Sequence, residues 1–347
     1  MKKTDLTNFT LSQLTDFVQG LGLPKFRGKQ IFAWLYRPNI TEFSQMTDLA
    51  KDLRETLTSH ASFHWPEIDA FERSKDGTVK YGFKLKDNNY IESVLIPEDG
   101  RNTLCVSSQV GCAMGCGFCL TGGMGLKRNL SPGEIVAQVV RVRNWLHDEA
   151  GTESVLSNIV FMGMGEPLAN FDNLLVALEI LTDQRGLDFS DRRITVSTCG
   201  LVPKIIELGQ KTKANLAVSL HSVDDSVRSR LMPVNKKYPV ADLLEACKNF
   251  PMPKRKRIMF EYILIKDLND SVSDAENLAK SLQDIPCKIN LLPYNETTDL
   301  SFQRPSDETI GLFQKTLREA GYTVFVRSSR GSDISAACGQ LAGKMSS

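Results

Sequence analysis

The sequence predicts an α/β fold in which parallel strands form an open sheet or curl into a partial (β/α)6 barrel. Two observations predict it: strand-like apolar runs recur along the chain, and helix-like stretches lie between most of them. About six βα units in series argue for a parallel sheet. In such folds, ligands bind beyond the carboxyl ends of the strands. The strand-like runs lie near 103–107, 158–162, 193–197, 215–220, 257–264, 288–292 and 323–327.

Residues 1–62 are expected to form a small helical domain. Apolar residues recur at helical spacing around Leu14, and further helices are expected around Trp34 and Leu57. Basic side chains surround the aromatic ones in this segment: Lys25, Arg27, Lys29 and Arg37. They form either a solvated charged face over an aromatic core or an RNA-contacting appendage. The sequence leaves both interpretations open.

Residues 63–97 are expected to form a β-hairpin extension, because 80–85 and 90–96 read as strands separated by a turn at Asp87-Asn88-Asn89. The α/β core is expected to span 98–335, followed by a C-terminal segment, 336–347. Ser131-Pro132-Gly133-Glu134 carries the N-terminal signals of a core helix.

Composition narrows the class of protein. The 347 residues include 42 Lys and Arg against 41 Asp and Glu, so a net charge of +1 excludes a broadly basic nucleic-acid coat but leaves room for a local basic face. No apolar run approaches membrane-spanning length, and the N-terminus is polar, so we expect a soluble cytoplasmic protein. Nothing signals oligomerisation, and a monomer is expected by default.

Eight cysteines are too few for a disulfide scaffold in a chain of this length. Three of them, Cys112, Cys116 and Cys119, have the spacing C-x3-C-x2-C. Thiolates are the usual ligands of iron–sulfur clusters, and three can bind a cubane while leaving its fourth iron open to a substrate. Structural zinc is the alternative, but it normally requires a fourth protein ligand nearby.

With an aromatic residue before its last cysteine, this motif resembles the signature of radical S-adenosylmethionine (SAM) enzymes. The surrounding motifs are similar to those of the RlmN/Cfr family of RNA adenosine methyltransferases, from about residue 10 to residue 345. These motifs are Gly163-Met164-Gly165-Glu166-Pro167-Leu168-Ala169-Asn170, Ser197-Thr198-Cys199-Gly200, Ser219-Leu220-His221-Ser222 and Ala337-Cys338-Gly339-Gln340-Leu341.

The resemblance implies a radical SAM barrel with one [4Fe–4S] cluster, and two SAM molecules used per turnover. It also implies a set of SAM-contacting positions near successive strand ends. Each of these residues alone has an ordinary structural explanation, such as a helix cap or a core histidine. The set is Gly165, Glu166, Ser197, Ser219, Leu220, His221 and Asn295.

The resemblance further assigns catalytic roles to three residues. Cys338 accepts a methyl group from the first SAM and becomes S-methylcysteine. A radical derived from the second SAM activates that methyl, which then adds to the adenine ring. Cys105 resolves the protein–RNA adduct through a transient disulfide with Cys338, and Glu92 takes the ring proton. Without the resemblance, Cys338 and Cys105 read as packed cysteines and Glu92 as an outward-facing strand residue.

The implied reaction is methylation of carbon 2 of adenosine, at adenosine 2503 of 23S rRNA and at adenosine 37 of tRNAs. Pro167, Cys199 and the segment 302–306 favour this over Cfr-like methylation of carbon 8. A non-catalytic, metal-stabilised RNA-binding module is the alternative of another class. A flavodoxin-type electron donor is usual for the family.

Basic side chains are expected to rim the RNA site by binding its phosphates. They are Lys127, Arg128, Arg192, Arg193, Lys236, Lys237, Lys254, Arg255, Lys256, Arg257, Arg327 and Arg330.

Overall fold

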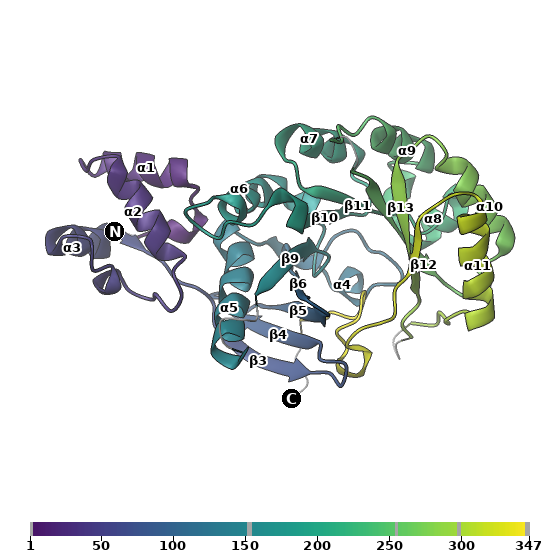
Figure 1. Ribbon diagram of the computed structural model, residues 1–347, viewed down its shortest axis with the longest axis horizontal. Helices are drawn as coiled ribbons and strands as arrows, with labels where there is room; N and C mark the ends of the chain where they lie inside the picture. The colour runs from purple at the N-terminus through teal and green to yellow at the C-terminus, as the bar shows by residue number, and fades with distance from the viewer. Residues whose placement is uncertain (1–2, 151–154, 254–255, 297–299, 344–347) are drawn as a thin grey trace.

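The computed structural model describes residues 3–150, 155–253, 256–296 and 300–343. Two members of the expected basic rim, Lys254 and Arg255, and the end of the C-terminal segment lie outside the described residues. Figure 1 shows a small helical unit beside a larger α/β body, with the C-terminal chain running back across that body. No helix among the described residues is both long and apolar enough to cross a membrane.

The N-terminal unit contains the expected helices, α1 (Leu11–Gly20), α2 (Phe26–Leu35) and α3 (Lys51–His60). Thr10 starts α1 with a capping box, because its side chain accepts from the Gln13 N–H at 3.3 Å while the Gln13 side chain accepts from the Thr10 N–H at 2.9 Å. A short parallel pair, β1 (Thr4–Asp5) and β2 (Ala61–Ser62), joins the two ends of the unit.

A ten-stranded mixed sheet, counted over the described residues, forms the body of the molecule, in the order β14-β13-β12-β11-β10-β9-β6-β5-β4-β3. All neighbours from β6 to β14 are parallel, which confirms the α/β prediction. The strands are β3 (Ile68–Arg73), β4 (Val79–Lys84), β5 (Tyr90–Glu98), β6 (Arg101–Cys105), β9 (Leu156–Phe161), β10 (Ile194–Thr198), β11 (Asn215–Ser219), β12 (Ile258–Leu264), β13 (Cys287–Pro293) and β14 (Val324–Val326).

The expected hairpin is present as β4 and β5, and it continues the main sheet. β5 pairs antiparallel with β6, so the hairpin is hydrogen-bonded to the core through the whole length of β6. The sequence analysis did not predict β3. This edge strand alternates half-buried and exposed residues and has charged side chains at Asp69, Glu72 and Arg73, which weakens its apolar signal.

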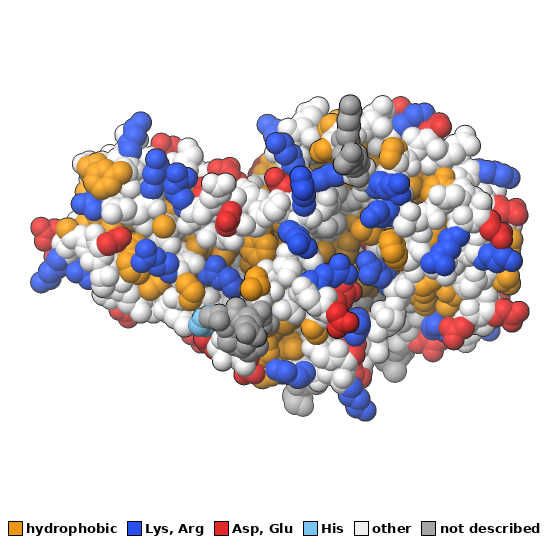
Figure 2. Space-filling model, viewed as in Figure 1, with side chains coloured by type: hydrophobic (Ala, Val, Ile, Leu, Met, Phe, Trp, Pro, Cys, Tyr) orange, Lys and Arg blue, Asp and Glu red, His pale blue; other side chains and the backbone are white. Residues whose placement is uncertain are grey.

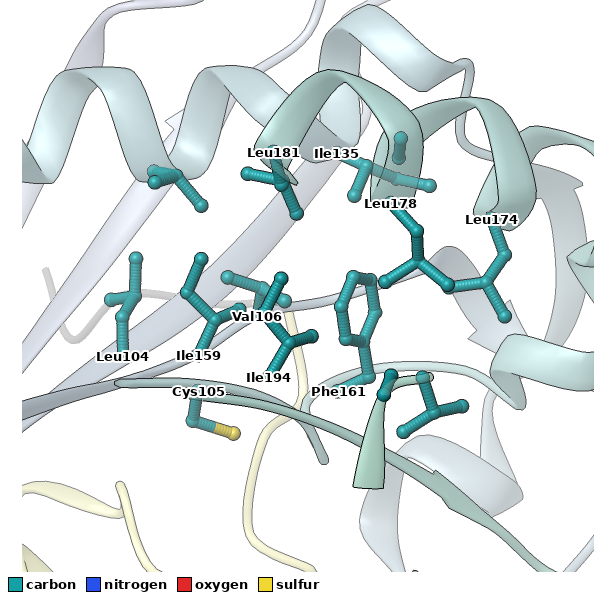
Figure 3. Close-up of a cluster of buried hydrophobic side chains, with 14 of the residues drawn as sticks. Leu104, Cys105, Val106, Ile135, Ile159, Phe161, Leu174, Leu178, Leu181 and Ile194 are labelled. Carbon is teal, nitrogen blue, oxygen red and sulfur yellow. The ribbon is translucent and has the colours of Figure 1, made fainter. Parts of the chain in front are cut away.

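Helices cover one face of the parallel strands: α5 (Pro132–Ala150), α6 (Phe171–Thr182), α7 (Val202–Lys211), α9 (Val240–Lys248), α10 (Val272–Ser281) and α11 (Asp307–Glu319). Figure 3 shows this packing: Ile135 and Leu178 come down from α5 and α6 onto Leu104, Ile159 and Phe161 of the sheet. We call this the outer face. Its apolar residues are almost completely buried, as expected for strands beneath helices.

The register shows which residues share the opposite, inner face, because directly paired side chains point to the same side of a sheet. Cys105 pairs with Val94 on β5, so Glu92, two residues earlier, shares its face. Ser197 pairs with Ala217, two residues before Ser219, and Ser219 pairs with Glu261. Cys105 pairs with Val160, and Val160 pairs with Thr195, two residues before Ser197, so Cys105 belongs to the same set. The inner face therefore carries both the strand residues of the expected site and a carboxylate not predicted to belong to it.

A small antiparallel ribbon, β7 (Gln109–Cys112) with β8 (Gly125–Asn129), encloses the cysteine motif and the short helix α4 (Leu120–Gly123). Gly111 has φ +74°, and a Cβ there would lie 1.9 Å from the Gly125 carbonyl oxygen. Only glycine allows this close approach of the two backbones, so Gly111 fixes the base of the cysteine loop.

Candidate active site

The three cysteines of the motif lie on the loop between β7 and α4. Cys112 ends β7 and Cys119 precedes α4. The loop turns tightly, because the Cys119 N–H donates to the Cys116 carbonyl at 3.1 Å, so the three cysteines lie on one short turn. Burial raises the pKa of Cys112 to about 11 and that of Cys116 further. The Gly117 N–H donates to the Leu231 carbonyl at 2.8 Å, which fastens the loop to the end of helix α8 (Asp225–Leu231).

The arrangement of the cysteines fits a cluster better than a single metal ion. Among the described residues, no group of three or more His, Cys, Asp or Glu side chains converges closely enough to hold one ion. Tetrahedral zinc with Zn–S bonds of ~2.3 Å requires its sulfurs to meet around one point. In a cubane each thiolate binds its own iron, so the sulfurs stay further apart. The three thiols match the ligand set of a cubane with one open iron, whereas a structural zinc site requires a fourth protein ligand.

The C-terminal segment brings Cys338 to the cysteine loop. The Leu120 N–H donates to the Gly339 carbonyl at 2.8 Å, and the Thr121 hydroxyl donates to the Leu341 carbonyl at 2.5 Å. Gly339 has φ +85°, and a Cβ there would lie 3.1 Å from the Phe118 carbonyl oxygen, so a side chain would disturb this contact. Residues widely separated in the sequence are therefore held side by side.

Cys338 also lies near Cys105, and the charge of each thiolate would affect its neighbours. Burial raises the pKa of Cys105, and the charge of Cys338 raises it further. Cys338 is an exposed residue, yet desolvation by the surrounding protein raises its thiol pKa to about 11, with further contributions from Glu261 and Cys119. Figure 3 shows that the Cys105 sulfur points away from the apolar cluster on the outer face. Both thiols are thus protonated at neutral pH, and each must lose its proton before it acts as a nucleophile.

Glu92 is buried on β5 and holds the end of the C-terminal segment. Its Oε2 accepts hydrogen bonds from the Ala342 N–H at 2.9 Å and the Gly343 N–H at 3.0 Å. The Lys80 ammonium lies 3.9 Å from Oε1. Burial raises the pKa of Glu92, and these two hydrogen bonds and Lys80 oppose the rise. The carboxyl group therefore lies beneath the segment that carries Cys338, and it does not face outward.

Gly165 and Glu166 follow β9. The Glu166 carboxylate accepts from the Leu168 N–H at 3.0 Å through Oε1 and from the Cys199 N–H at 2.8 Å through Oε2, so it ties β9 to the end of β10. Burial raises its pKa. Gly165 has φ +98°, and a Cβ there would lie 2.5 Å from the Gln109 Cβ, so a side chain cannot be accommodated without movement.

The remaining expected SAM positions lie at the ends of β10, β11 and β13. His221 is buried, and its Nδ1 accepts from the Ile263 N–H at 3.0 Å. Burial lowers its pKa to about 3, so the ring is neutral with its proton on Nε2. The ring also contacts Phe118 of the cysteine loop edge-on, at 4.8 Å between centroids. Asn295 reaches the same region, since its Nδ2 donates to the Cys338 carbonyl at 3.4 Å.

Two buried inner-face residues were missed by the sequence analysis. Glu261 accepts from Asn290 Nδ2 at 2.9 Å, and burial raises its pKa to about 7. The Asn290 Oδ1 is buried and has no hydrogen-bond partner in the described part of the chain. A signal was available, because Glu261 interrupts an otherwise apolar strand, Ile258–Leu264, and a lone carboxylate in such a strand requires an explanation.

The surface around the site is rich in Lys and Arg, and in Figure 2 many of these side chains surround the hollowed middle of the body. Not all of the cations expected to bind phosphate are available. Arg128 forms two hydrogen bonds with Glu134, at 2.8 and 2.9 Å, and one with Asp87 at 2.5 Å. A guanidinium held by two carboxylates is a poor phosphate ligand, so Arg128 is better described as a structural residue.

Comparison with known proteins identifies the family of the chain. Residues 4–63 match the family model for the ribosomal RNA large subunit methyltransferase N-terminal domain, and residues 106–281 match the radical SAM superfamily. The chain is 55% identical over 345 residues to the dual-specificity RNA methyltransferase RlmN of Desulfotalea psychrophila, covering 98% of this chain and 95% of that protein. It is 52% identical to the RlmN of Geotalea uraniireducens, covering 99% and 98%.

A solved structure is similar over the same length. The crystal structure of a radical SAM methyltransferase from Sphaerobacter thermophilus superposes with a TM-score of 0.92 at 43% sequence identity, covering 98% of this chain and 100% of that one. The similarity therefore includes the helical unit, the sheet and the C-terminal segment.

Proposed function

Because the chain belongs to the RlmN family of radical SAM RNA methyltransferases, we propose that it methylates carbon 2 of adenosine in RNA through an S-methylcysteine on Cys338. The family uses a [4Fe–4S] cluster and SAM. The proposed substrates are adenosine 2503 of 23S rRNA and adenosine 37 of tRNAs. Family membership excludes the alternative of a non-catalytic RNA-binding module.

One observation carries the proposal: Cys338 and Cys105 are brought together beside the cysteine loop. Gly339, next to Cys338, accepts from the Leu120 N–H of the loop at 2.8 Å. Glu92, which shares the inner face with Cys105, binds the same C-terminal segment at Ala342 and Gly343. A protein that used the loop only as a structural metal site would not require a second pair of cysteines there. A methyl carrier and a resolving thiol require this proximity, because the two sulfurs must form a bond with each other.

In the proposed site, Cys112, Cys116 and Cys119 hold the cluster. When bound, the cluster supplies the electron that cleaves SAM and starts radical chemistry. Gly165, Glu166, Ser197, the segment 219–221 and Asn295 orient the SAM molecule. The Glu166 carboxylate suits the SAM amino group, which has only hydrogen-bond donors to offer, and each carboxylate oxygen retains acceptor capacity beyond its one backbone N–H.

Cys338 is proposed to act first as a nucleophile. Its sulfur loses a proton, bonds to the methyl carbon of SAM and releases the rest of that molecule as S-adenosylhomocysteine. After the activated methyl, which has lost one hydrogen atom, has bonded to the adenine ring, the adduct returns the electron that started the reaction and Glu92 takes the ring proton. The Cys105 thiolate then attacks the Cys338 sulfur. The sulfur–carbon bond breaks, the carbon keeps the bonding electrons and takes up a proton to complete the methyl group, and a Cys105–Cys338 disulfide remains. A cellular reductant of the dithiol class restores the two thiols.

The raised pKa of Glu92 supports its role as a base, since a carboxyl group titrating nearer to neutrality accepts a proton more readily than an exposed one. Glu92 also holds the segment 342–343 through Oε2, so the proposed base fixes the end of the segment that carries Cys338. A flavodoxin-type donor, a monomeric state, a cytoplasmic location and the domain limits 1–62, 63–97, 98–335 and 336–347 belong to the same proposal.

The experiment that tests the function is anaerobic. The cluster is reconstituted, and the protein is given reductant, SAM with a trideuterated methyl group and a 23S rRNA fragment. Mass spectrometry of the digested RNA should show 2-methyladenosine whose methyl carries two of the deuteriums, because one is lost from the Cys338 methyl. 8-Methyladenosine would assign Cfr-like chemistry instead. SAM cleavage without any methylated adenosine would contradict the proposed substrate.

Variants of single cysteines separate the steps. Cys338→Ala should abolish methylation, by at least about 10³-fold, because the methyl carrier is absent. Cys105→Ala should leave RNA covalently attached to the protein, visible as a shifted band that ribonuclease removes. Cys247→Ala is the matched control, since this cysteine is buried in α9. Equal activity of all three variants would contradict the scheme.

A further inference from the structure

Arg228, on α8, is a completely buried arginine. The hydrogen bonds that its guanidinium donates within the described residues go to uncharged oxygens. Nε donates to the Leu220 carbonyl at 3.0 Å, and Nη2 donates to the carbonyls of Cys199 at 2.8 Å and Ser219 at 3.2 Å. Nη1 donates to the Asn235 side-chain oxygen at 2.8 Å. Arg228 is therefore well hydrogen-bonded, but no carboxylate of the described residues pairs with it.

These bonds connect Arg228 to the proposed SAM site. The carbonyl of Cys199 follows β10, and those of Ser219 and Leu220 lie at the end of β11, so one side chain holds two neighbouring strand ends at a fixed separation. Gly200 leaves space for this arrangement, because it has φ +112° and a Cβ there would lie 3.2 Å from Nη2. The planar guanidinium of arginine donates hydrogen bonds in several fixed directions at once, so it can bind both strand ends. The single ammonium of lysine cannot reproduce these hydrogen bonds.

The same helix contacts the cysteine loop. Leu231, which ends α8, accepts from the Gly117 N–H at 2.8 Å, and Gly117 lies between Cys116 and Cys119. Cys116 and Phe118 of this loop pack against the buried apolar cluster that contains Leu231 of α8 and Cys199. α8 thus joins the strand ends on one side to the cluster loop on the other, with a cation between them.

A buried guanidinium without an opposite charge is destabilising, because the cation loses its hydration on burial and an opposite charge is needed to compensate. Asp225 is exposed and connects to Arg228 through Asn235, which donates to the Asp225 carboxylate at 2.8 Å and accepts from Arg228. A cluster with three thiolate ligands is an anion, and its negative charge increases when it accepts an electron. The missing counter-charge of Arg228 is then supplied by the cluster itself.

We propose that Arg228 is a positioning residue that holds the SAM-site strand ends and places a fixed positive charge beside the cluster, which raises the reduction potential of the cluster. The inference rests on the proposed cluster ligation but not on the RNA substrate or on carbon 2. A purely structural brace would stabilise the fold and leave the potential unchanged, so the potential distinguishes the two roles.

The test is an anaerobic redox titration of the reconstituted protein, without RNA, followed by electron paramagnetic resonance of the reduced cluster. In Arg228→Gln, the ratio of reduced to oxidised cluster at the wild-type midpoint should fall about tenfold, which corresponds to about 59 mV for one electron. Arg228→Lys retains the charge and should change this ratio less than threefold, while weakening SAM binding because the fork is lost.

The matched control is Arg143→Gln. Arg143 lies on α5, its Nη2 donates to the Tyr36 carbonyl at 2.6 Å, and burial lowers its pKa as it does for Arg228. This variant should lose stability without moving the potential. An unchanged potential in Arg228→Gln would overturn the proposal. A tenfold change in Arg228→Lys would also overturn it, and this variant keeps the proposal falsifiable if Arg228→Gln does not fold. A wild-type protein that binds no cluster would instead contradict the proposed function.

Discussion

The outer and inner faces of the same strands differ sharply, although their residues alternate along the chain. On the outer face, Ile159, Val196 and Phe260 are completely buried beneath helices. On the inner face, Ser197 and Glu261 are nearly as buried, but they are polar. A fold that only needed a core would place apolar residues on both faces of such strands. The comparison shows that the outer face carries the stability of the sheet, while the polar inner face suits the site proposed there.

The first prediction concerns the outer face, where the largest effect on stability is expected. Phe260→Ala should lower the free energy of unfolding by roughly 3–5 kcal/mol, because it removes a buried ring and leaves a cavity. Phe325→Ala is the control on the inner face, where this residue is 42% exposed and pairs with Asn290. It should change stability by about 0.5 kcal/mol or less. Denaturant unfolding of the apoprotein measures both, and equal losses would remove the distinction between the faces.

The difference between the faces also explains what the sequence could predict. Outer-face residues such as Val218 and Phe260 form the periodic apolar runs from which the strands were predicted, and each predicted run coincides with a strand. The cysteine loop was recognisable because its ligands are close in sequence. By contrast, the contact of Gly339 with Leu120 joins distant segments, and no local pattern encodes it.

Arg228 illustrates the same limit. Its segment, Asp225–Leu231, is short and reads as an ordinary charged surface helix, with Arg228 and Arg230 near its end. Only the fold reveals that one of these arginines is completely buried and the other exposed. β3 escaped prediction for the opposite reason, because an edge strand exposes charged side chains that obscure its alternation.

The second prediction uses pH to isolate the inner face. Burial raises the pKa of Glu261 from 4.5 to about 7, so between these values the unfolded chain has lost a proton that the folded protein keeps. Stability should therefore fall as the pH rises from about 4.5 to about 7, by on the order of 3 kcal/mol from this group. Glu261→Gln should remove that part of the fall, so its advantage over the wild type grows with pH.

Thermal unfolding between pH 4.5 and 8 measures this difference. Glu319→Gln, an exposed glutamate at the end of α11, is the control and should leave the wild-type pH profile unchanged. If Glu261→Gln and the wild type lost stability in parallel over this range, Glu261 would be ionised throughout, and the inner face would be more polar than its burial implies.

The third prediction has the smallest effect and separates the two faces within one strand. Ser197 and Val196 are neighbours on β10 and point to opposite sides. Ser197→Ala should weaken SAM binding about fivefold, the equivalent of one hydrogen bond of about 1 kcal/mol, and change stability little. Val196→Ala should lower stability by roughly 1.5–3 kcal/mol through lost burial and leave SAM affinity unchanged.

Anaerobic calorimetric titration of the cluster-loaded protein with SAM measures the affinity, and thermal unfolding measures the stability. Should Val196→Ala weaken SAM binding as much as Ser197→Ala, the affinity would depend on the packing of the whole strand, and the inner face would not act on its own.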